Sequence, residues 1–490
     1  MRAVLISSEC EPWAKTGGLA DVVDALARAL GRLPDEPERP VEVFLPRYRS
    51  VPLPEAVGRR RLRVPDPLGS DGMTELSILD VEADGYRLRL IDHPPAFDRD
   101  GFYGDANGDY PDDPWRFGLF CRAALEAVRT EDRPVDVLSL HEWQACPTVL
   151  YRDTAHAADP VIGRAAVTLT LHNLAYHGWT PRDRLAQFLF PAERAAVVPA
   201  GADGLDLLRA GIERAELVNT VSRGYAAEVL TPEYGMGLDD VLARRRDRFL
   251  GIRNGLDMAV WDPATDADVA ATYSAADLAG KAVCRRDLLS RVGMDPDAAG
   301  PVLGMIGRLD PQKGFDLLAG AAERLVDAGA RLVVLGSGQP DLVAGLRDLA
   351  AAEPTRIALL ERFDRVLARR IYAGADFFLM PSRFEPCGQG QMIALRYGTP
   401  PVVRRTGGLA DTVVDVDAEP ATGTGFVFDE ATPEAFLAAC ERAMARFEAG
   451  GPDWTALLRR GMAVDWSWVT GPAREYEAMY ERAVALRRAG

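Results

Sequence analysis

The hexapeptide Thr-Gly-Gly-Leu-Ala-Asp occurs twice in the sequence, at Thr16–Asp21 and at Thr406–Asp411, and a basic residue precedes each copy. An apolar pattern typical of a helix follows each copy. Adjacent glycines let backbone N–H groups approach a ligand, because no Cβ atom stands in the way. The start of the helix adds partial positive charge. Either copy alone could be an ordinary glycine turn, but the repetition predicts two α/β halves that face one anionic ligand.

Strands and helices alternate along the chain in two series. Apolar runs of strand length recur with helical patterns between them, which is typical of doubly wound α/β domains with parallel sheets. The predicted strands of the first series are Arg2–Ser7, Val41–Leu45, Tyr86–Ile91, Val135–Leu140, Ala165–Leu171 and Ala215–Val221. Those of the second series are Val302–Ile306, Arg331–Leu335, Arg356–Leu360, Asp376–Met380, Pro400–Val403 and Gly425–Phe428. Residues 51–75 give no clear element.

The break between the two series lies at Asn254–Asp266, which is crowded with Gly, Pro, Asn and Asp. Such a composition is typical of an interdomain linker. We therefore predict a first domain over residues 1–256 and a second over residues 257–465. Residues 466–490 form an amphipathic helical pattern. This helix either packs back on the first domain or is simply the last helix of the second.

The composition argues against several classes of partner. The chain has 490 residues and a net charge of −16, which disfavours nucleic acid or an anionic membrane as the main partner. No run of 18 apolar residues is present, so no membrane span is predicted. The six cysteines stand alone, without the spacing of metal ligands. We therefore expect no structural zinc site and a reducing, cytoplasmic location.

Polar residues follow two neighbouring apolar strands of the first series. His141, Glu142 and Trp143 come directly after one strand, and His172 and Asn173 come directly after the next. In open parallel sheets, ligands bind at the carboxyl ends of the strands. These residues, and His172 above all, are therefore candidates for a functional site. The alternative is that the histidines are ordinary polar loop residues.

Charged residues also follow two strands of the second series. Arg308 and Lys313 stand in the segment GRLDPQKG, where they can both point toward the end of the preceding strand. An arginine gives bidentate contacts to a diphosphate and a lysine adds a point charge. Glu385 stands in PSRFEPCGQG (Pro381–Gly390), between a strand and the start of a helix. Its carboxylate is predicted to lie at the edge of a ligand site, or alternatively to support the loop.

The fingerprints of other common enzyme classes are absent from the sequence. We find no GxGxxG, no Walker GxxxxGK[ST], no GxSxG and no HExxH segment. Hydride transfer with a dinucleotide and P-loop nucleotide hydrolysis therefore lack sequence support.

Motifs that span nearly the whole chain resemble, in this order, the bacterial glycogen synthase and plant starch synthase family. In the first half the matching segments are KTGGLADV (Lys15–Val22), HEWQ (His141–Gln144), LTLHNLAYHG (Leu169–Gly178), NTVS (Asn219–Ser222) and NGLDMAVWDPATD (Asn254–Asp266). In the second half they are GRLDPQKG (Gly307–Gly314), PSRFEPCG (Pro381–Gly388), RYGTPPVVRRTGGLADTV (Arg396–Val413) and DWSW (Asp465–Trp468).

The resemblance implies the GT-B fold, in which two Rossmann-like domains have the active site in the cleft between them. It also implies a retaining glycosyltransferase that needs neither metal nor cofactor. The implied reaction moves glucose from a nucleotide sugar, which we take to be ADP-glucose, to the non-reducing end of an α-1,4-glucan.

The resemblance also assigns roles to individual residues. Catalysis is expected of Glu385, His172, Arg308 and Lys313, the last two neutralising the departing diphosphate in place of a divalent metal. The expected contacts to the nucleotide sugar are Lys15, Gly17, Gly18, Asp21, Asn254, Phe363, Cys387 and Gly388. The expected contacts to the glucan or its sugar are Trp143, Glu142 and Asn173.

Four residues depart from the pattern of the family. Glu142 stands where the family usually has Asp, and Gln389-Gly390 replace a common Leu-Thr. Phe363 replaces a Tyr expected to stack on the nucleotide base, so stacking is kept while the phenol hydrogen bond is lost. UDP-glucose as the donor, or another GT-B reaction, therefore remains an alternative. A further alternative of another class is a non-catalytic glucan-binding protein on a GT-B scaffold. The sequence leaves the oligomeric state open.

Overall fold

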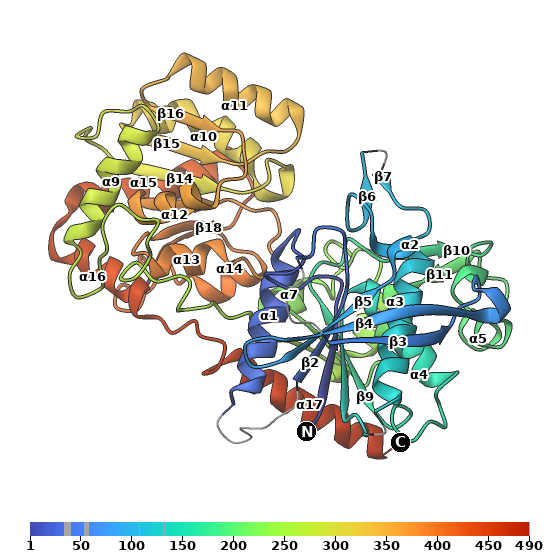
Figure 1. Ribbon diagram of the computed structural model, residues 1–490. Helices are drawn as coiled ribbons and strands as arrows, with labels where there is room; N and C mark the ends of the chain where they lie inside the picture. Colours follow the sequence, from blue (N-terminus) through green and yellow to red (C-terminus); the bar gives the residue numbers. More distant parts are fainter. Residues whose placement is uncertain (34–40, 53–57, 107, 132, 490) are drawn as a thin grey trace. The chain divides into compact units, whose positions relative to one another are not determined.

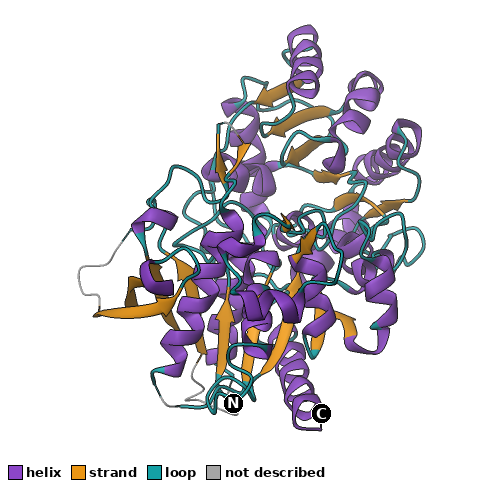
Figure 2. Cartoon of the chain, turned by 90° about the vertical axis from the view of Figure 1, so that its right-hand side faces the viewer, coloured by secondary structure: helices purple, strands orange, loops and turns teal. Residues whose placement is uncertain are grey.

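The computed structural model describes residues 1–33, 41–52, 58–106, 108–131 and 133–489, which form two compact units. Unit 1 comprises Met1–Val221, Ala226–Gly255 and Trp468–Gly490, and unit 2 comprises Ser222–Tyr225 and Leu256–Ser467. Each unit has a sheet with helices packed against it (Figures 1 and 2). None of the helices among the described residues is both long enough and apolar enough to cross a membrane.

Unit 1 is built on a nine-stranded sheet with the order β13-β12-β9-β8-β1-β2-β5-β4-β3. Its strands are β1 (Ala3–Ile6), β2 (Val41–Pro46), β3 (Gly58–Pro65), β4 (Met73–Glu82), β5 (Arg87–Asp92), β8 (Val137–His141), β9 (Ala166–Leu171), β12 (Leu217–Thr220) and β13 (Phe249–Gly251). The pairings from β13 to β5 are parallel, whereas β4 is antiparallel to both β5 and β3. Two further antiparallel pairs form small separate sheets, β6 (Gly104–Asp105) with β7 (Gly108–Asp109) and β10 (Trp179–Pro181) with β11 (Gly204–Asp206).

The α-helices that lie wholly or partly in unit 1 are α1 (Gly18–Gly31), α2 (Pro94–Phe97), α3 (Asp113–Arg129), α4 (Pro147–Asp153), α5 (Pro191–Val197), α6 (Leu207–Arg214), α7 (Arg223–Glu228), α8 (Asp239–Arg244) and α17 (Pro472–Ala489). The C-terminal helix α17 packs on this sheet through two tyrosines. The Tyr480 hydroxyl donates to Ser139 Oγ of β8 (2.9 Å), and the Asn219 amide of β12 donates to the Tyr476 hydroxyl (3.1 Å). These bonds satisfy polar side chains that the sheet buries.

Residues 51–75 show no clear element in the sequence, whereas the structure has strands among them. Residues 53–57 lie outside the described part, but β3 and the start of β4 form an antiparallel hairpin at the edge of the sheet. Of the residues of β3 only Val64 is buried, and the strand carries arginines at three successive positions. An edge strand of this composition lacks the apolar run that identifies a buried parallel strand.

Unit 2 is built on a six-stranded parallel sheet with the order β16-β15-β14-β17-β18-β19. Its strands are β14 (Val302–Ile306), β15 (Arg331–Leu335), β16 (Ile357–Leu360), β17 (Phe377–Met380), β18 (Pro401–Arg404) and β19 (Phe426–Phe428). Its helices include α9 (Ala279–Arg291), α10 (Phe315–Asp327), α11 (Pro340–Ala352), α12 (Arg365–Gly374), α13 (Gly390–Arg396), α14 (Gly407–Thr412), α15 (Pro433–Ala449) and α16 (Gly451–Ala463). Both units are therefore α/β domains built mainly of parallel strands, as the sequence predicts.

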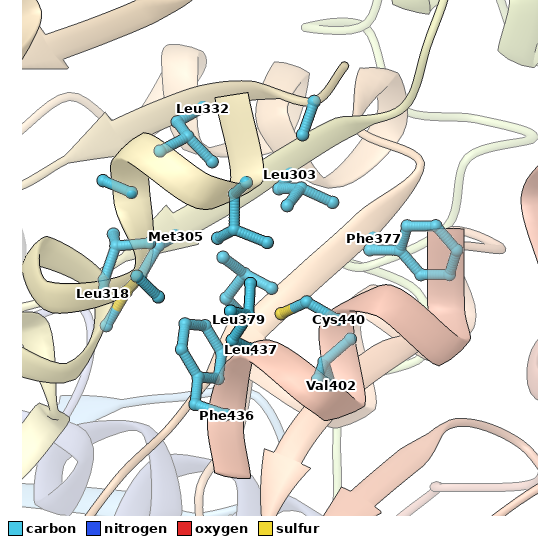
Figure 3. Close-up of a cluster of buried hydrophobic side chains, with 14 of the residues drawn as sticks. Leu303, Met305, Leu318, Leu332, Phe377, Leu379, Val402, Phe436, Leu437 and Cys440 are labelled. Carbon is cyan, nitrogen blue, oxygen red and sulfur yellow. The ribbon is translucent and has the colours of Figure 1, made fainter. Parts of the chain in front are cut away.

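Alternate residues of β14 face different helices, so the sheet of unit 2 is covered on both faces. Leu303 and Met305 join a buried cluster that includes Leu437 of α15 (Figure 3). Val302 instead packs in a second cluster that includes Ile371 of α12. Burial on both faces explains why this strand appears in the sequence as a continuous apolar run.

A buried lysine ties several segments of unit 2 together. Lys281 of α9 donates from Nζ to Thr399 Oγ1 (2.7 Å) and to the carbonyl oxygens of Ala373, Ala375 and Tyr397 (3.1–3.2 Å). Burial lowers the pKa of Lys281 to about 8. Two of these carbonyls lie at the end of α12, where a cation is favourable to the helix dipole.

The two copies of TGGLAD both begin helices but have different surroundings. In the first copy, which begins α1, a Cβ atom added at Gly17 or Gly18 would meet no atom within 4 Å. In the second copy, which begins α14, a Cβ atom on Gly408 would lie 2.1 Å from the carbonyl oxygen of Cys387. The Gly408 N–H also donates to the Glu385 carbonyl (3.0 Å). The second copy therefore packs tightly inside unit 2, whereas no atom lies within 4 Å of the added Cβ positions of the first. That both copies face an anionic ligand stays a prediction.

This difference predicts opposite effects for one substitution at matched positions of the motif. Gly408→Ala must displace the backbone of Cys387, and we expect it to destabilise unit 2 by about 3 kcal/mol. Gly18→Ala has room for its methyl group and should leave stability within about 0.5 kcal/mol. Thermal unfolding followed by circular dichroism would show a midpoint lowered by roughly 6–12 °C for Gly408→Ala alone. Equal midpoints for the two variants would contradict the packing described here.

Candidate active site

The first cluster of predicted residues lies at the carboxyl ends of β8 and β9 in unit 1. The His141 ring faces the His172 ring, with 3.1 Å between Nδ1 of His141 and Nε2 of His172. The Glu142 carboxylate accepts the backbone N–H groups of His172 and Asn173 through Oε1, the latter at 2.9 Å. Glu142 has a φ of 65°, which few residues other than glycine adopt. The two strands are parallel neighbours, which brings these residues together.

Burial governs the electrostatics of this cluster. It lowers the pKa of His141 to about 3, and it lowers the pKa of His172 well below the ordinary value, with a smaller contribution from His141. Burial raises the pKa of Glu142 to about 7, against the opposing effect of the backbone N–H groups that it accepts. Both imidazoles are therefore neutral at physiological pH, and they can act as hydrogen-bond donors and acceptors without carrying charge.

Three other predicted residues of unit 1 have different surroundings. Trp143 is 9% exposed, and its ring lies so close to Gly178 that a Cβ atom there would be 2.3 Å from it. Asn173 uses its side-chain oxygen to accept the N–H of Ala175 (3.0 Å). Asn254 is buried, and its side-chain oxygen has no hydrogen-bond partner among the described residues. A buried amide oxygen of this kind can accept a hydroxyl hydrogen bond from a ligand.

The loop that carries Lys15 is held by a residue that the sequence analysis did not select. The Glu9 carboxylate accepts the Thr16 N–H (2.6 Å), the Gly17 N–H (3.2 Å) and the Thr16 hydroxyl (2.5 Å). Lys15 in turn contacts Asp21, with 2.6 Å between Nζ and Oδ1. Glu9 lies just beyond the end of β1, and that position at a strand end was the signal that could have identified it.

In unit 2 the structure brings Lys313 and Glu385 together at the ends of β14 and β17, which are neighbours in the sheet. Lys313 Nζ lies 2.6 Å from Glu385 Oε2, and the Glu385 side chain is 7% exposed. The Ser382 hydroxyl donates to the same carboxylate oxygen (3.2 Å). The Asp310 carboxylate accepts the backbone N–H of Lys313 (3.0 Å), which fixes the turn that presents the lysine.

Arg308 and Phe363 are held less firmly than this pair. The Arg308 side chain is 63% exposed, and its nearest charged partner is Asp310, with 3.4 Å between Nε and Oδ2. Phe363 is 86% exposed in the loop between β16 and α12. An exposed guanidinium and an exposed ring can both reorient to meet a ligand at little cost.

The loop from Glu385 to Gly388 is shaped by its backbone contacts. Gly388 has a φ of 68°, which favours glycine. The Gln391 amide donates to the carbonyl oxygens of Cys387 and Gly388, both at 3.0 Å, and to the Thr412 hydroxyl. Cys387 is buried. Gln391 is a second supporting residue that the sequence pattern did not reveal.

The arrangement in unit 2 combines two cations with a carboxylate. Lys313 and Arg308 can stabilise negative charge that develops on a leaving group, since they are held near strand ends where ligands bind. Glu385 is already oriented by Lys313 and Ser382. Such a set suits the transfer of a group from a phosphate ester or diphosphate.

Comparison with known families and proteins places similar sequences along nearly the whole chain. Residues 2–244 match the starch synthase catalytic domain, and residues 300–446 match the glycosyl transferases group 1. The chain is 40% identical to glycogen synthase 2 of Geobacter sulfurreducens over 490 residues, with complete coverage of both chains. It is 42% identical to the glycogen synthase of Anaeromyxobacter dehalogenans over 485 residues, which cover 98% of this chain and 99% of that protein.

Solved structures give the same assignment. The catalytic domain of starch synthase IV from Arabidopsis thaliana, bound to ADP and acarbose, matches with a TM-score of 0.88 and 33% identity over 99% of both chains. A sucrose-phosphate synthase from Thermosynechococcus elongatus shares the fold, with a TM-score of 0.58 and 17% identity over 99% of each chain. With full-length relatives at about 40% identity, the chain belongs to the glycogen synthase and starch synthase family of GT-B glycosyltransferases.

Proposed function

We propose that this protein is a glycogen synthase that transfers glucose from ADP-glucose to the non-reducing end of an α-1,4-glucan with retention of configuration. The observation that carries the proposal is the pair formed by Lys313 and Glu385 at the ends of β14 and β17, in a chain that matches glycogen synthases over its full length. The structure of the starch synthase relative contains ADP, which favours an adenine nucleotide as the donor here.

The chemistry of unit 2 follows from the charges that the reaction develops. Breaking the bond between the anomeric carbon and the diphosphate leaves positive charge on the sugar and adds negative charge to the phosphates. Lys313 and Arg308 stabilise the departing diphosphate more strongly in the transition state than in the ground state. Glu385 lies beside the sugar, where its negative charge balances the developing cation. Lysine and arginine thus perform the task that a divalent metal performs in other transferases.

Retention follows if the acceptor hydroxyl approaches from the face that the leaving group vacates. The new bond forms between the glucan oxygen and the anomeric carbon while the carbon–oxygen bond to the diphosphate breaks. The departing phosphate oxygen then accepts the hydroxyl proton, so no separate base is needed. A product with an inverted β linkage would contradict this course.

The roles of the unit 1 residues stay predictions. His172 and Asn254 are proposed to donate or accept hydrogen bonds at the donor sugar, and Lys15 with the open backbone of Gly17 and Gly18 is proposed to contact the nucleotide sugar. The contacts of the glucan are proposed to involve Trp143, Asn173 and Glu142, although Glu142 already accepts two backbone N–H groups through one oxygen. We place the reaction in the cytoplasm, where the six cysteines, none of which forms a disulfide in the described part of the chain, would stay reduced.

Donor choice tests the proposal directly. The purified protein is incubated with glycogen and with either ADP-glucose or UDP-glucose carrying labelled glucose. We expect label to enter the glucan mainly from ADP-glucose and to be released by an enzyme that cleaves only α-1,4 linkages. Faster transfer from UDP-glucose would support the alternative donor. Glycogen binding without release of either nucleoside diphosphate would instead indicate a non-catalytic binding protein.

Glu385→Ala is predicted to impair turnover rather than nucleotide binding. Loss of the carboxylate removes an interaction that matters most in the transition state, so kcat should fall by about 10²-fold or more. The KM for ADP-glucose should change less than about threefold. Steady-state kinetics measure both constants, and Glu353→Ala serves as a control because this exposed carboxylate of unit 2 lies in the turn after α11. A near-normal kcat for Glu385→Ala would show that the site is assigned wrongly.

Lys313→Ala is predicted to weaken nucleotide binding as well as turnover, since the diphosphate is charged before the reaction begins. Loss of a hydrogen bond between charged groups should raise the Kd of ADP about tenfold to a hundredfold. Isothermal titration calorimetry measures this Kd. The matched control is Arg324→Ala, which removes an exposed basic side chain of α10 in the same unit. Unchanged affinity for ADP in Lys313→Ala would place the diphosphate elsewhere.

A further inference from the structure

His141 is a buried polar residue with one hydrogen-bond partner in the described structure. It ends β8, it is 0% exposed, and its Nδ1 lies 3.1 Å from Nε2 of His172. Its other ring nitrogen, Nε2, is buried and meets no donor or acceptor among the described residues. The roles assigned above give His141 no part in the reaction, yet it is the side chain that contacts the ring of His172.

The contact between the two rings allows two arrangements of protons, because one nitrogen must donate and the other must accept. In the first, Nδ1–H of His141 donates, so the proton of the neutral His172 lies on its own Nδ1. In the second, Nε2–H of His172 donates, and the proton of His141 is then on Nε2, where it has no acceptor. The first arrangement leaves only a lone pair unsatisfied. Buried N–H groups without an acceptor are rarer in folded proteins than under-satisfied acceptors, which favours the first arrangement.

We infer that His141 is a positioning residue that holds His172 neutral, with its proton on Nδ1, so that His172 offers an N–H donor to a hydroxyl of the donor sugar. The inference rests on the proposed function for the identity of that hydroxyl. The Nδ1 of His172 hydrogen-bonds to no other described residue, and His172 is only partly buried, so this nitrogen is available to a ligand.

The surroundings of the pair support a neutral His172. The nearest carboxylate on the same strand end, Glu142, directs Oε1 to the backbone N–H groups of His172 and Asn173 rather than to either ring. The two rings are 5.4 Å apart between centroids and tilted by 36°, so they meet through their nitrogens instead of stacking face to face. Glu142 thus holds the main chain of His172 while His141 holds its ring.

Two substitutions of His141 separate this role from simple packing. His141→Phe keeps a ring of similar size but has no donor, whereas His141→Asn places an amide nitrogen near the position of Nδ1. We expect kcat to fall about tenfold to a hundredfold in His141→Phe, with the KM for ADP-glucose within about twofold. His141→Asn should retain kcat within about threefold. Equal losses in the two variants would overturn the inference.

A control variant accounts for the general cost of replacing a buried histidine. His156 is 8% exposed in the same unit and contacts Glu126 rather than His172. His156→Phe should therefore leave kcat unchanged. A double-mutant cycle between His141→Phe and His172→Ala gives a further test, because residues that act through one contact are not additive. Additive losses in kcat would contradict a role exerted through His172.

The protonation state can be observed without measuring activity. The chain has five histidines, and long-range ¹H–¹⁵N correlation spectra of protein labelled in histidine distinguish the two neutral forms. His172→Ala assigns the signal. We expect the Nδ1–H form for His172 in the native protein at pH 7 and a loss of that preference in His141→Phe.

The spectrum separates failure of this inference from failure of the proposed function. A native His172 that is charged, or that carries its proton on Nε2, would overturn the inference even if the protein makes glycogen. The expected spectrum in a protein that transfers no glucose would instead reject the proposed function and retain the effect of His141 on His172. If His141→Phe fails to fold, the native spectrum and the kinetics of His141→Asn still test the inference about His141.

Discussion

Parallel pairing of strands is the constraint on which both candidate sites depend. Each parallel pair requires a crossover that returns the chain to the same edge of the sheet, so residues far apart in sequence end next to one another. His141 and His172, 31 positions apart, meet because β8 and β9 are neighbours. Lys313 and Glu385, 72 positions apart, meet because β14 and β17 are neighbours. The chemistry of each unit is therefore a consequence of its strand order.

The parallel strands and their polar ends could be predicted because burial on two faces leaves continuous apolar runs in the sequence. Val302–Ile306 is identical in the prediction and in the structure, and Glu385 lies at a strand end as expected. The hairpin of β3 and β4 escaped prediction because an edge strand needs no such run. The repeated motif TGGLAD did not predict the packing around each copy, since the two copies differ in what packs against their glycines.

The contacts of the supporting residues could not be predicted, because each depends on tertiary structure that no local pattern encodes. The place of Glu9 beyond a strand end marks it only as a candidate, because the sequence does not show that it accepts hydrogen bonds from a loop seven residues away. Gln391 appears in the sequence as a polar residue inside a helix pattern. Only the structure shows that it supports the loop, because its amide donates to the Cys387 carbonyl. The pairing of His141 with His172 requires the register of β8 against β9, which hydrophobic alternation alone does not determine.

Nearly all the basic residues of this chain are arginines, and this composition has a practical consequence. Of the 57 lysines and arginines, only Lys15, Lys281 and Lys313 are lysines. Lys281 is buried among four oxygen atoms, whereas the side chains of Lys15 and Lys313 are partly exposed. Reagents that acylate primary amines modify most proteins at many surface lysines. On this protein, apart from the amino terminus, they can reach only the two side chains that contact Asp21 and Glu385, so covalent amine labelling would report on those two loops alone.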